Sequence, residues 1–186
     1  MKRFFDFFLA VIISILLFIP IVFVVIAVWL TSKGPALYWS DRIGENNKIF
    51  KMPKFRSMLT DTPAVATHLL DNPDVYLSPI GGFLRSTSLD ELPQIFSVLK
   101  GDMSFVGPRP ALFNQKDLIA LRTEKGVDKL LPGITGWAQV NGRDELSILD
   151  KVALDVEYLN HQSFWFDMKI LWMTFLKVIK KDGVSH

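Results

Sequence analysis

The sequence predicts an α+β protein, mostly helical, in which an N-terminal membrane helix precedes a small cytosolic domain with amphipathic helices at the membrane interface. Three observations lead to this expectation. Phe7–Leu30 carries no charge, short apolar pieces alternate with turn residues over 37–58, and Ser163–Lys181 is rich in aromatic residues and lysine. The chain has 186 residues and no internal repeat or low-complexity linker. We therefore expect two units, residues 1–32 in the membrane and residues 33–186 at its surface.

The composition excludes several kinds of protein. Hydrophobic residues make up 49% of the chain and the mean hydropathy is +0.27, which is high for a soluble domain. The net charge of +2 gives no global support for binding a polyanion, so we expect no nucleic-acid partner. Any anion must be bound by individually placed residues. Cysteine is absent, which rules out disulfides and thiolate metal sites and leaves the redox compartment open.

The uncharged N-terminal segment is long enough to reach across a bilayer. At ~1.5 Å per helical residue, Phe7–Leu30 matches a hydrocarbon core of ~30 Å. A cleaved signal peptide has a shorter apolar region of ~7–15 residues, followed by small residues at the cleavage site. Thr31–Ala36 is a poor cleavage site, so the sequence favours a retained membrane element.

Pro20 and the flanking charges favour a re-entrant helix. Pro20 lacks an N–H and crowds the carbonyl of Leu16, so we expect the helix to break at Pro20. A re-entrant helix keeps both basic flanks in the cytoplasm, which positive charges prefer, whereas a single crossing would put one flank outside. A kinked spanning helix is the alternative. The basic residues of the two flanks are Lys2, Arg3, Lys33, Arg42, Lys48, Lys51, Lys54 and Arg56.

The rest of the chain is expected to alternate short strands, loops and helices. In chain order the patterns indicate irregular structure or a short hairpin over 37–58 with a turn at Gly44–Asn47, a loop with at most one helical turn over 60–79, a helix over Leu92–Leu99 stopped by Gly101, helical structure over 110–130, a loop over 132–136 and a charged helix over 145–160.

Ser163–Lys181 is expected to be the last helix. Its many Trp and Phe residues, interspersed with lysines, are typical of a helix at the bilayer interface. A core helix with one solvated face has the same pattern. The membrane segment at the other end of the chain favours the interfacial interpretation.

The acidic pair Asp90 and Glu91 stands where a loop should become a helix. Ser88 to Glu91 fits a capping box, with Ser88 as the cap and Glu91 reaching back. Pro93 argues for a different start, because with Ser88 as cap it would be the fifth helical residue and would remove a helical bond. With Asp90 as cap, Pro93 takes the third position and no bond is lost. Asp90 would then lie at a helix mouth, where free N–H groups attract phosphate.

The spacing of the two carboxylates limits their chemistry. Adjacent helical residues point about 100° apart, so Asp90 and Glu91 do not form the facing pair of a glycosidase. A division of labour suits them better, with one carboxylate as nucleophile and the other on a hard cation. Mg²⁺ typically takes one or two carboxylates together with phosphate oxygens of the substrate, and aspartate is a known covalent nucleophile.

Basic residues near glycine and proline turns could supply the complementary charge. Arg85 precedes the acidic pair, Arg109 lies between two prolines, and Lys54 and Arg56 share a short segment. Arginine can grip phosphate with two parallel hydrogen bonds, whereas lysine acts as a point charge. Each of these residues taken alone fits a surface position or a contact with lipid headgroups. Their joint occurrence favours phosphate binding.

Several blocks follow one another in order along the chain. They are Arg42-Ile-Gly44, Lys54-Phe-Arg-Ser-Met58, Ile80-Gly with Phe83-Leu-Arg85, Thr87-Ser-Leu-Asp-Glu-Leu-Pro-Gln94, Val98-Leu-Lys-Gly-Asp-Met-Ser104, Val106-Gly-Pro-Arg-Pro110 and Pro132-Gly-Ile-Thr-Gly-Trp-Ala-Gln-Val-Asn-Gly-Arg143. On these blocks the chain resembles the bacterial sugar transferase family, the monotopic phosphoglycosyl transferases, over nearly its whole length. Ser97, Met52-Pro53 and Trp137 depart from the family's usual residues, and none of them is part of the acidic pair.

The resemblance implies a reaction and a location. Such enzymes transfer a sugar 1-phosphate from a UDP-sugar to undecaprenyl phosphate and release UMP, as the first membrane step of glycoconjugate synthesis. The partners would be these two substrates and lipids of the bacterial inner membrane, with the catalytic domain facing the cytoplasm. A homodimer stays open. A membrane-surface scaffold and a lipid phosphatase are the alternative functions.

The resemblance also implies roles for particular residues. Asp90 would be the nucleophile that forms a phosphosugar–aspartyl intermediate, and Glu91 would hold the cofactor Mg²⁺. The substrate-binding residues would be Lys54, Arg56, Arg85, Arg109, Gln139, Arg143 and Asp155, with Gln139 and Arg143 on the nucleotide side.

Overall fold

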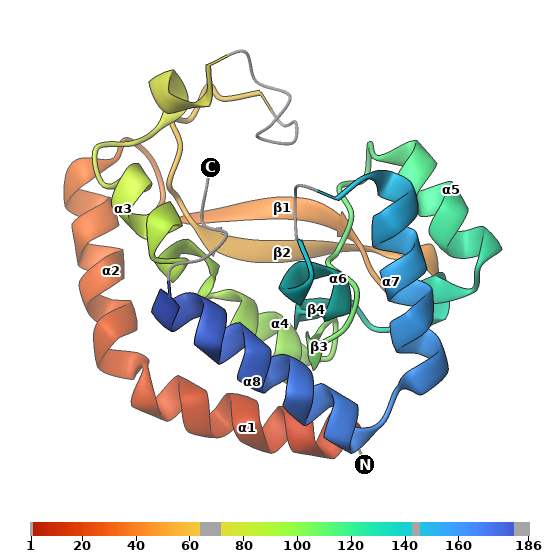
Figure 1. Ribbon diagram of the computed structural model, residues 1–186. Helices are drawn as coiled ribbons and strands as arrows, with labels where there is room; N and C mark the ends of the chain where they lie inside the picture. Colours follow the sequence, from red (N-terminus) through yellow and green to blue (C-terminus); the bar gives the residue numbers. More distant parts are fainter. Residues whose placement is uncertain (1, 64–71, 143–145, 181–186) are drawn as a thin grey trace.

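The computed structural model describes residues 2–63, 72–142 and 146–180 (Figure 1). It mixes helices and strands, and 58% of it is helical, so the expected α+β class with mostly helical structure is confirmed. The helices form an outer frame around a central hairpin, with α1 and α8 lying along one side (Figure 1). The division of the chain at residue 32 stays a prediction.

The N-terminal segment forms two helices, α1 (Lys2–Leu16) and α2 (Phe18–Thr31), bent by 64°. The break lies at Leu17, so the expectation of a break at Pro20 itself is wrong by three residues. The reason is that the ring of Pro20 conflicts with the carbonyl of Leu16, where α1 ends. Pro20 itself is the third residue of α2, where a missing N–H costs no helical bond. In the described part of the chain, only the bent pair together reaches the length and apolar composition of a membrane span; neither helix does so alone.

Polar residues at the start of α1 attach it to the rest of the molecule. Lys2 forms an ion pair with Asp167 at 2.5 Å. Arg3 donates to the carbonyl oxygens of Val98 and Leu99 at the end of α4. The buried Asp6 accepts a hydrogen bond from the backbone N–H of Phe105 at 3.3 Å. Since α2 leads directly into β1, both ends of the bent pair are held by the same domain.

The expected hairpin is confirmed and more regular than the sequence indicated. Strands β1 (Leu37–Ile43) and β2 (Ile49–Phe55) are antiparallel, with Leu37 opposite Phe55 and Ile43 opposite Ile49. The turn contains a 3₁₀ segment, η1 (Glu45–Asn47), in which Asn46 and Asn47 have φ of 54° and 58°. Asparagine tolerates this left-handed region better than most residues. The hairpin presents Lys54 close to its end.

The segment after the hairpin builds the acidic turn. It contains η3 (Pro73–Tyr76), α3 (Gly81–Ser86), a 3₁₀ turn η4 (Leu89–Glu91) and α4 (Gln94–Lys100). The single helical turn expected over 60–79 corresponds to η3. Helix α4 ends at Gly101 with φ 103°, as the sequence predicted, because glycine adopts this conformation without strain.

The second half of the chain is mainly helical. Its elements are β3 (Ser104–Val106), α5 (Lys116–Glu124), η5 (Val127–Lys129), β4 (Gly133–Thr135), α6 (Trp137–Val140), α7 (Ile148–His161) and α8 (Phe164–Lys180). The expected helices over 110–130, 145–160 and 163–181 are found with shorter bounds. The loop expected over 132–136 is instead a strand in part, since β4 pairs in parallel with β3. A three-residue strand surrounded by glycines leaves no periodic signal in a sequence.

The main core joins the N-terminal helix to the domain. Ala10, Val98, Met103 and Ile170 are all fully buried in one cluster that draws on α1, α4 and α8. The outer face of α8 is apolar as well, and Trp165 and Trp172 are 78% and 61% exposed. Helix α8 therefore has both features that the sequence left open, a buried face and an exposed aromatic face; its contact with a bilayer stays a prediction.

Candidate active site

The acidic pair lies in a 3₁₀ turn before α4, and this corrects both interpretations of its sequence. Ser88 has φ 55° and its side chain makes no capping bond, so the capping box is absent. Asp90 is not the cap of α4 either, because α4 begins at Gln94 with Pro93 immediately before it. A separate short turn lets Pro93 stand outside the helix, where its missing N–H is not needed. Asp90 is 8% exposed.

Two cations from distant segments meet the acidic pair. Lys54 Nζ lies 2.8 Å from Glu91 Oε1 and 3.8 Å from Asp90 Oδ2. Arg109 donates to the same Glu91 Oε1 at 3.3 Å. Within the part of the chain that the structure describes, Glu91 is the carboxylate nearest to both cations, and Asp90 lies farther from Lys54.

Burial dominates the ionisation of Asp90. It raises the pKa of the Asp90 carboxyl above its ordinary value, and the neighbouring Glu91 charge acts in the same direction. Lys54, Arg85 and Arg109 oppose the rise of this pKa. A carboxylate that is buried yet surrounded by cations is typical of a catalytic group.

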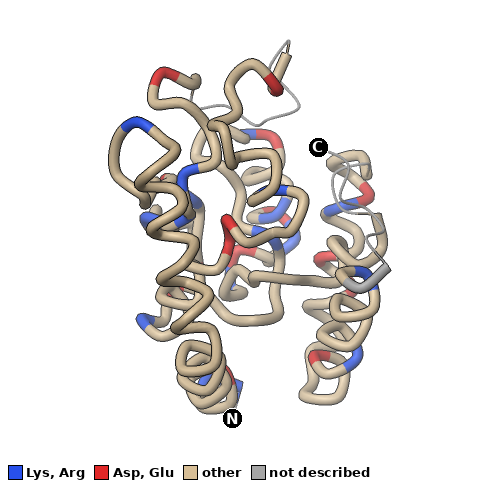
Figure 2. Tube along the Cα trace, turned by 90° about the vertical axis from the view of Figure 1, so that its left-hand side faces the viewer, with Lys and Arg blue, Asp and Glu red and all other residues tan. Residues whose placement is uncertain are grey.

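The acidic pair lines a cavity of about 440 Å³ that is rich in cations. This cavity, the charged cavity below, extends between the hairpin, the acidic turn and α5 to α7. Seven of its lining residues are basic, Arg42, Lys54, Arg56, Arg85, Arg109, Arg122 and Lys151, and three are acidic, Asp41, Asp90 and Glu91. Acidic segments near the centre of the molecule, with basic segments around them, can be followed in Figure 2. The local excess of positive charge exceeds the net charge of the whole chain, +2, and suits an anionic ligand.

The structure brings most of the expected site residues together. Lys54, Arg56, Arg85, Arg109 and Gln139 all line the charged cavity with the acidic pair. Gln139 donates to the carbonyl oxygen of Ile134 at 2.9 Å, and its own Oε1 is buried and accepts no hydrogen bond within the described residues. The expected contact Arg143 lies outside the described residues.

Asp155 is placed differently from what the sequence suggested. It is 1% exposed and is not among the residues that line the charged cavity. Its Oδ2 accepts a hydrogen bond from Nε of Arg122 at 2.9 Å and lies 2.7 Å from Nη2 of the same arginine. Burial raises the pKa of Asp155, and Arg122 opposes that rise. Among the described residues, the hydrogen-bonded link between Asp155 and the charged cavity is Arg122.

Two arginines of the site were not selected from the sequence. Arg122 lies in the last turn of α5, and its partner Asp155 is 33 residues away. Arg42 donates to Pro110 O at 3.2 Å, across 68 residues. Burial, with the nearby Arg109 charge, lowers the pKa of Arg42 to about 10. Arg42 stood in a recognised block without an assigned role, and Arg122 carried no local signal.

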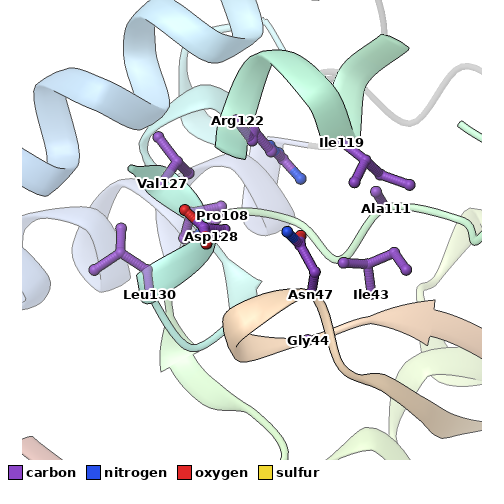
Figure 3. A pocket seen from close by; sticks show the side chains of 10 residues that line it. All are labelled: Ile43, Gly44, Asn47, Pro108, Ala111, Ile119, Arg122, Val127, Asp128 and Leu130. Carbon is purple, nitrogen blue, oxygen red and sulfur yellow. The ribbon is translucent and has the colours of Figure 1, made fainter. Parts of the chain in front are cut away.

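Arg122 also lines a second, smaller cavity. This cavity has a volume of about 30 Å³ and is lined by residues of the hairpin turn, α5 and η5 (Figure 3). Asn47, on its edge, donates to Thr123 Oγ1 at 2.9 Å and joins the turn to α5. A volume of about 30 Å³ has room for about one water molecule and is too small for a sugar nucleotide.

The carboxylates of the acidic pair suit a magnesium ion that takes some of its ligands from the protein and the others from a substrate. In residues 2–63, 72–142 and 146–180, no three His, Asp or Glu side chains are grouped closely enough to enclose a metal. Asp90 and Glu91 supply two adjacent carboxylates at the edge of a cationic cavity. This matches the way Mg²⁺ uses one or two carboxylates and completes its shell with phosphate oxygens and water.

Comparison with known proteins shows the family of this chain. The family model described as "Bacterial sugar transferase" matches residues 1–181, and the chain belongs to that family. The chain is 40% identical to the "Uncharacterized sugar transferase EpsL" of Bacillus subtilis (strain 168), covering 100% of this chain and 91% of EpsL. It is 41% identical to the "UDP-glucose:undecaprenyl-phosphate glucose-1-phosphate transferase" of Escherichia coli (strain K12), covering 95% of this chain and 40% of the relative.

A third relative is named for another sugar. The chain is 39% identical to the "Undecaprenyl-phosphate galactose phosphotransferase" of Salmonella typhimurium, covering 81% of this chain and 34% of that protein. The chain thus spans nearly all of EpsL but well under half of the two relatives named for a reaction.

Proposed function

We propose that this protein transfers a sugar 1-phosphate from a UDP-sugar to undecaprenyl phosphate and releases UMP. The observation that carries the proposal is the Asp90–Glu91 pair in a cationic cavity, in a chain that begins with a bent apolar helix pair. Relatives named for glucose and for galactose phosphotransfer are almost equally similar to the chain, which supports the class of reaction and not one sugar.

The chemistry divides into two displacements at one phosphorus atom. A carboxylate oxygen of Asp90 attacks the phosphorus that bears the sugar, and the bond from this phosphorus to the bridging oxygen breaks, so UMP leaves with that oxygen. A phosphate oxygen of undecaprenyl phosphate then attacks the same phosphorus and releases the Asp90 carboxylate. The product is a polyprenyl-diphosphate sugar. The two half-reactions predict ping-pong kinetics.

The neighbouring side chains prepare this attack. Lys54, 3.8 Å from Asp90, favours the ionised form that burial disfavours. Arg85 and Arg109 add positive charge at the cavity wall, where charge on the transferring phosphoryl group must be met. Mg²⁺ held by Glu91 would neutralise diphosphate charge.

The attachment of α1 supports a re-entrant topology. Lys2, Arg3 and Asp6 contact the same domain that α2 enters, which supports a topology with both ends of the pair on one side of a membrane. A spanning helix would have to release these contacts. The prediction is that a cysteine replacing Lys2 does not react with a membrane-impermeant thiol reagent added to intact cells, and reacts after the cells are opened. Labelling of intact cells would contradict the topology.

The test of the function is UMP release from a panel of UDP-sugars, including UDP-glucose and UDP-galactose, with Mg²⁺ and undecaprenyl phosphate. We expect release that requires both metal and lipid and that disappears in Asp90→Asn. Asp102→Asn, which changes an aspartate paired with Lys100 outside the cavity, is the matched control and should retain activity. Substantial turnover by Asp90→Asn would refute the covalent mechanism. Release of inorganic phosphate without a sugar donor would instead indicate a phosphatase.

A further inference from the structure

The turn that carries Arg109, Gly107–Pro110, and the following Ala111 are held mainly by hydrogen bonds to their backbone carbonyl oxygens. Its two prolines have no N–H to donate. Four successive carbonyls from Pro108 to Ala111 each accept a hydrogen bond. The donors, in order, are Gly133 N at 2.9 Å, Arg122 at 2.8 Å, Arg42 at 3.2 Å and Ile43 N at 2.9 Å. Two of the four donors are therefore arginine side chains.

Arg122 is fixed on both sides. Nη1 of Arg122 donates to the Arg109 carbonyl at 2.8 Å. Nε and Nη2 of Arg122 lie 2.9 and 2.7 Å from Oδ2 of Asp155. The Arg122 and Asp155 side chains are only 12% and 2% exposed. Charge-assisted bonds in such surroundings are short and directional, so Asp155 sets the direction in which Arg122 donates.

The carbonyl group that accepts the hydrogen bond from Arg122 is attached directly to the Cα of Arg109. The side chain of Arg109 reaches Glu91 at 3.3 Å, and Glu91 in turn binds Lys54 at 2.8 Å. A shift of the Arg109 carbonyl moves its Cα and with it the guanidinium. Because catalytic groups tolerate misplacement of only about 0.5 Å, the anchor at the carbonyl matters for the whole acidic cluster.

We propose that Arg122, oriented by Asp155, is a positioning residue that holds the Pro108–Pro110 turn so that Arg109 faces Glu91. This gives Asp155, expected from the sequence to bind substrate, an indirect role. Arg122 also lines the charged cavity, so direct contact with a substrate is the competing explanation. The proposal rests on the proposed function only for its kinetic test.

The first test needs no activity. Hydrogen–deuterium exchange is followed in a peptide that covers residues 104–113, whose flanking amides bind Thr135 O (from Gly107) and Gln115 Oε1 (from Leu112). Loss of a bond to a charged group should speed exchange in this segment about tenfold in Arg122→Gln. Arg122→Lys, which keeps a donor, should show a smaller change. Lys125 lies at the C-terminal end of α5 and, among the described residues, pairs only with Glu124. Exchange in Lys125→Gln should therefore match the wild type.

Exchange equal to wild type in Arg122→Gln would overturn the proposal. Should Arg122→Gln fail to fold, Asp155→Asn keeps the test decisive, because Arg122 stays in place and only its orientation is lost. The same segment should then exchange faster, while exchange in α2, which makes no hydrogen bond to this segment within the described residues, stays as in the wild type. Unchanged exchange in the 104–113 peptide of Asp155→Asn would overturn the proposal.

The second test separates positioning from substrate contact. kcat/KM for UMP release is measured for Arg122→Gln, Arg109→Gln and the double variant. Arg122→Gln should lower kcat/KM about tenfold in the wild-type background and less than about twofold when Arg109 is already replaced. Equal losses in both backgrounds would overturn the proposal in favour of direct contact. If no UDP-sugar is turned over by the wild type, the proposed function fails, and the exchange experiment still decides the role of Arg122.

Discussion

Replacing Asp90 by asparagine should abolish turnover and at the same time stabilise the protein. Asp90 is 8% exposed, and its closest described cation, Lys54 at 3.8 Å, binds Glu91 more closely at 2.8 Å. At an effective dielectric of about 20, the gross attraction of Lys54 is about 4 kcal/mol for Asp90 and about 6 kcal/mol for Glu91. Taking a carboxylate out of water costs several kcal/mol, and the Glu91 charge adds repulsion. The raised pKa of Asp90 shows that the unfavourable contributions prevail.

The expected gain in unfolding free energy is about 1 kcal/mol at pH 7, which corresponds to a rise in Tm of about 2–4 °C for a chain of this size. Since the pKa of Asp90 is raised in the folded protein, the group favours folding below its unfolded pKa of ~3.9, and this contribution is lost as pH rises through the folded pKa. The difference in Tm between variant and wild type should therefore be present at pH 7 and vanish as the pH falls toward ~4.

The assay is thermal unfolding of both proteins in the same detergent, with EDTA present, at a series of pH values. EDTA matters because a bound cation would favour the ionised wild type and narrow the difference. Asp102→Asn serves again as the control, since its carboxylate pairs with Lys100 at the surface. A lower Tm for Asp90→Asn than for the wild type at pH 7 would show that attraction to Lys54 outweighs burial, and would refute this account of the site.

Three further predictions follow from the same structure. Lys54→Gln removes the cation nearest to the acidic pair, so UMP release should fall about 100-fold and the acid limb of its pH profile should move to higher pH as the pKa of Asp90 rises further; an unmoved limb would contradict this. Glu91→Gln should raise the Mg²⁺ concentration needed for half-maximal activity, and an unchanged metal dependence would exclude Glu91 as a ligand. Leu84→Ala, at a fully buried position between α2 and β2, should cost about 2–4 kcal/mol in chemical unfolding, whereas Phe83→Ala, 58% exposed, should cost less than about 0.5 kcal/mol.

Local signals in the sequence were enough to predict many elements of the fold. The uncharged run with Pro20 predicted a broken N-terminal helix, and Gly101 predicted the end of α4, because both depend on the backbone of a few neighbouring residues. The start of α4 was predicted wrongly for the same reason. The sequence allowed either Ser88 or Asp90 as cap, and the chain uses neither, since a separate 3₁₀ turn accommodates Pro93.

The candidate site was predictable where its residues lie in dense blocks. Lys54, Arg85 and Arg109 stand in such blocks, and they line the charged cavity with the acidic pair. The ion pair between Arg122 and Asp155 was not predictable, because it depends on α5 packing against α7. A single arginine in the last turn of a charged helix has the same appearance whether it faces solvent or a buried carboxylate.

The two glycine-rich blocks of the sequence form one structural unit. A Cβ on Gly107 would lie 2.3 Å from Leu131 O, and one on Gly136 would lie 2.1 Å from Gly107 O. The backbones of the Val106–Pro110 and Pro132–Gly136 segments thus approach too closely for any side chain, and their parallel pairing fixes the turn from one side. Arg42 and Arg122 fix the same turn through its carbonyls. The glycines at these two positions thus permit the close backbone approach on which, in our proposal, the presentation of Arg109 to Glu91 depends.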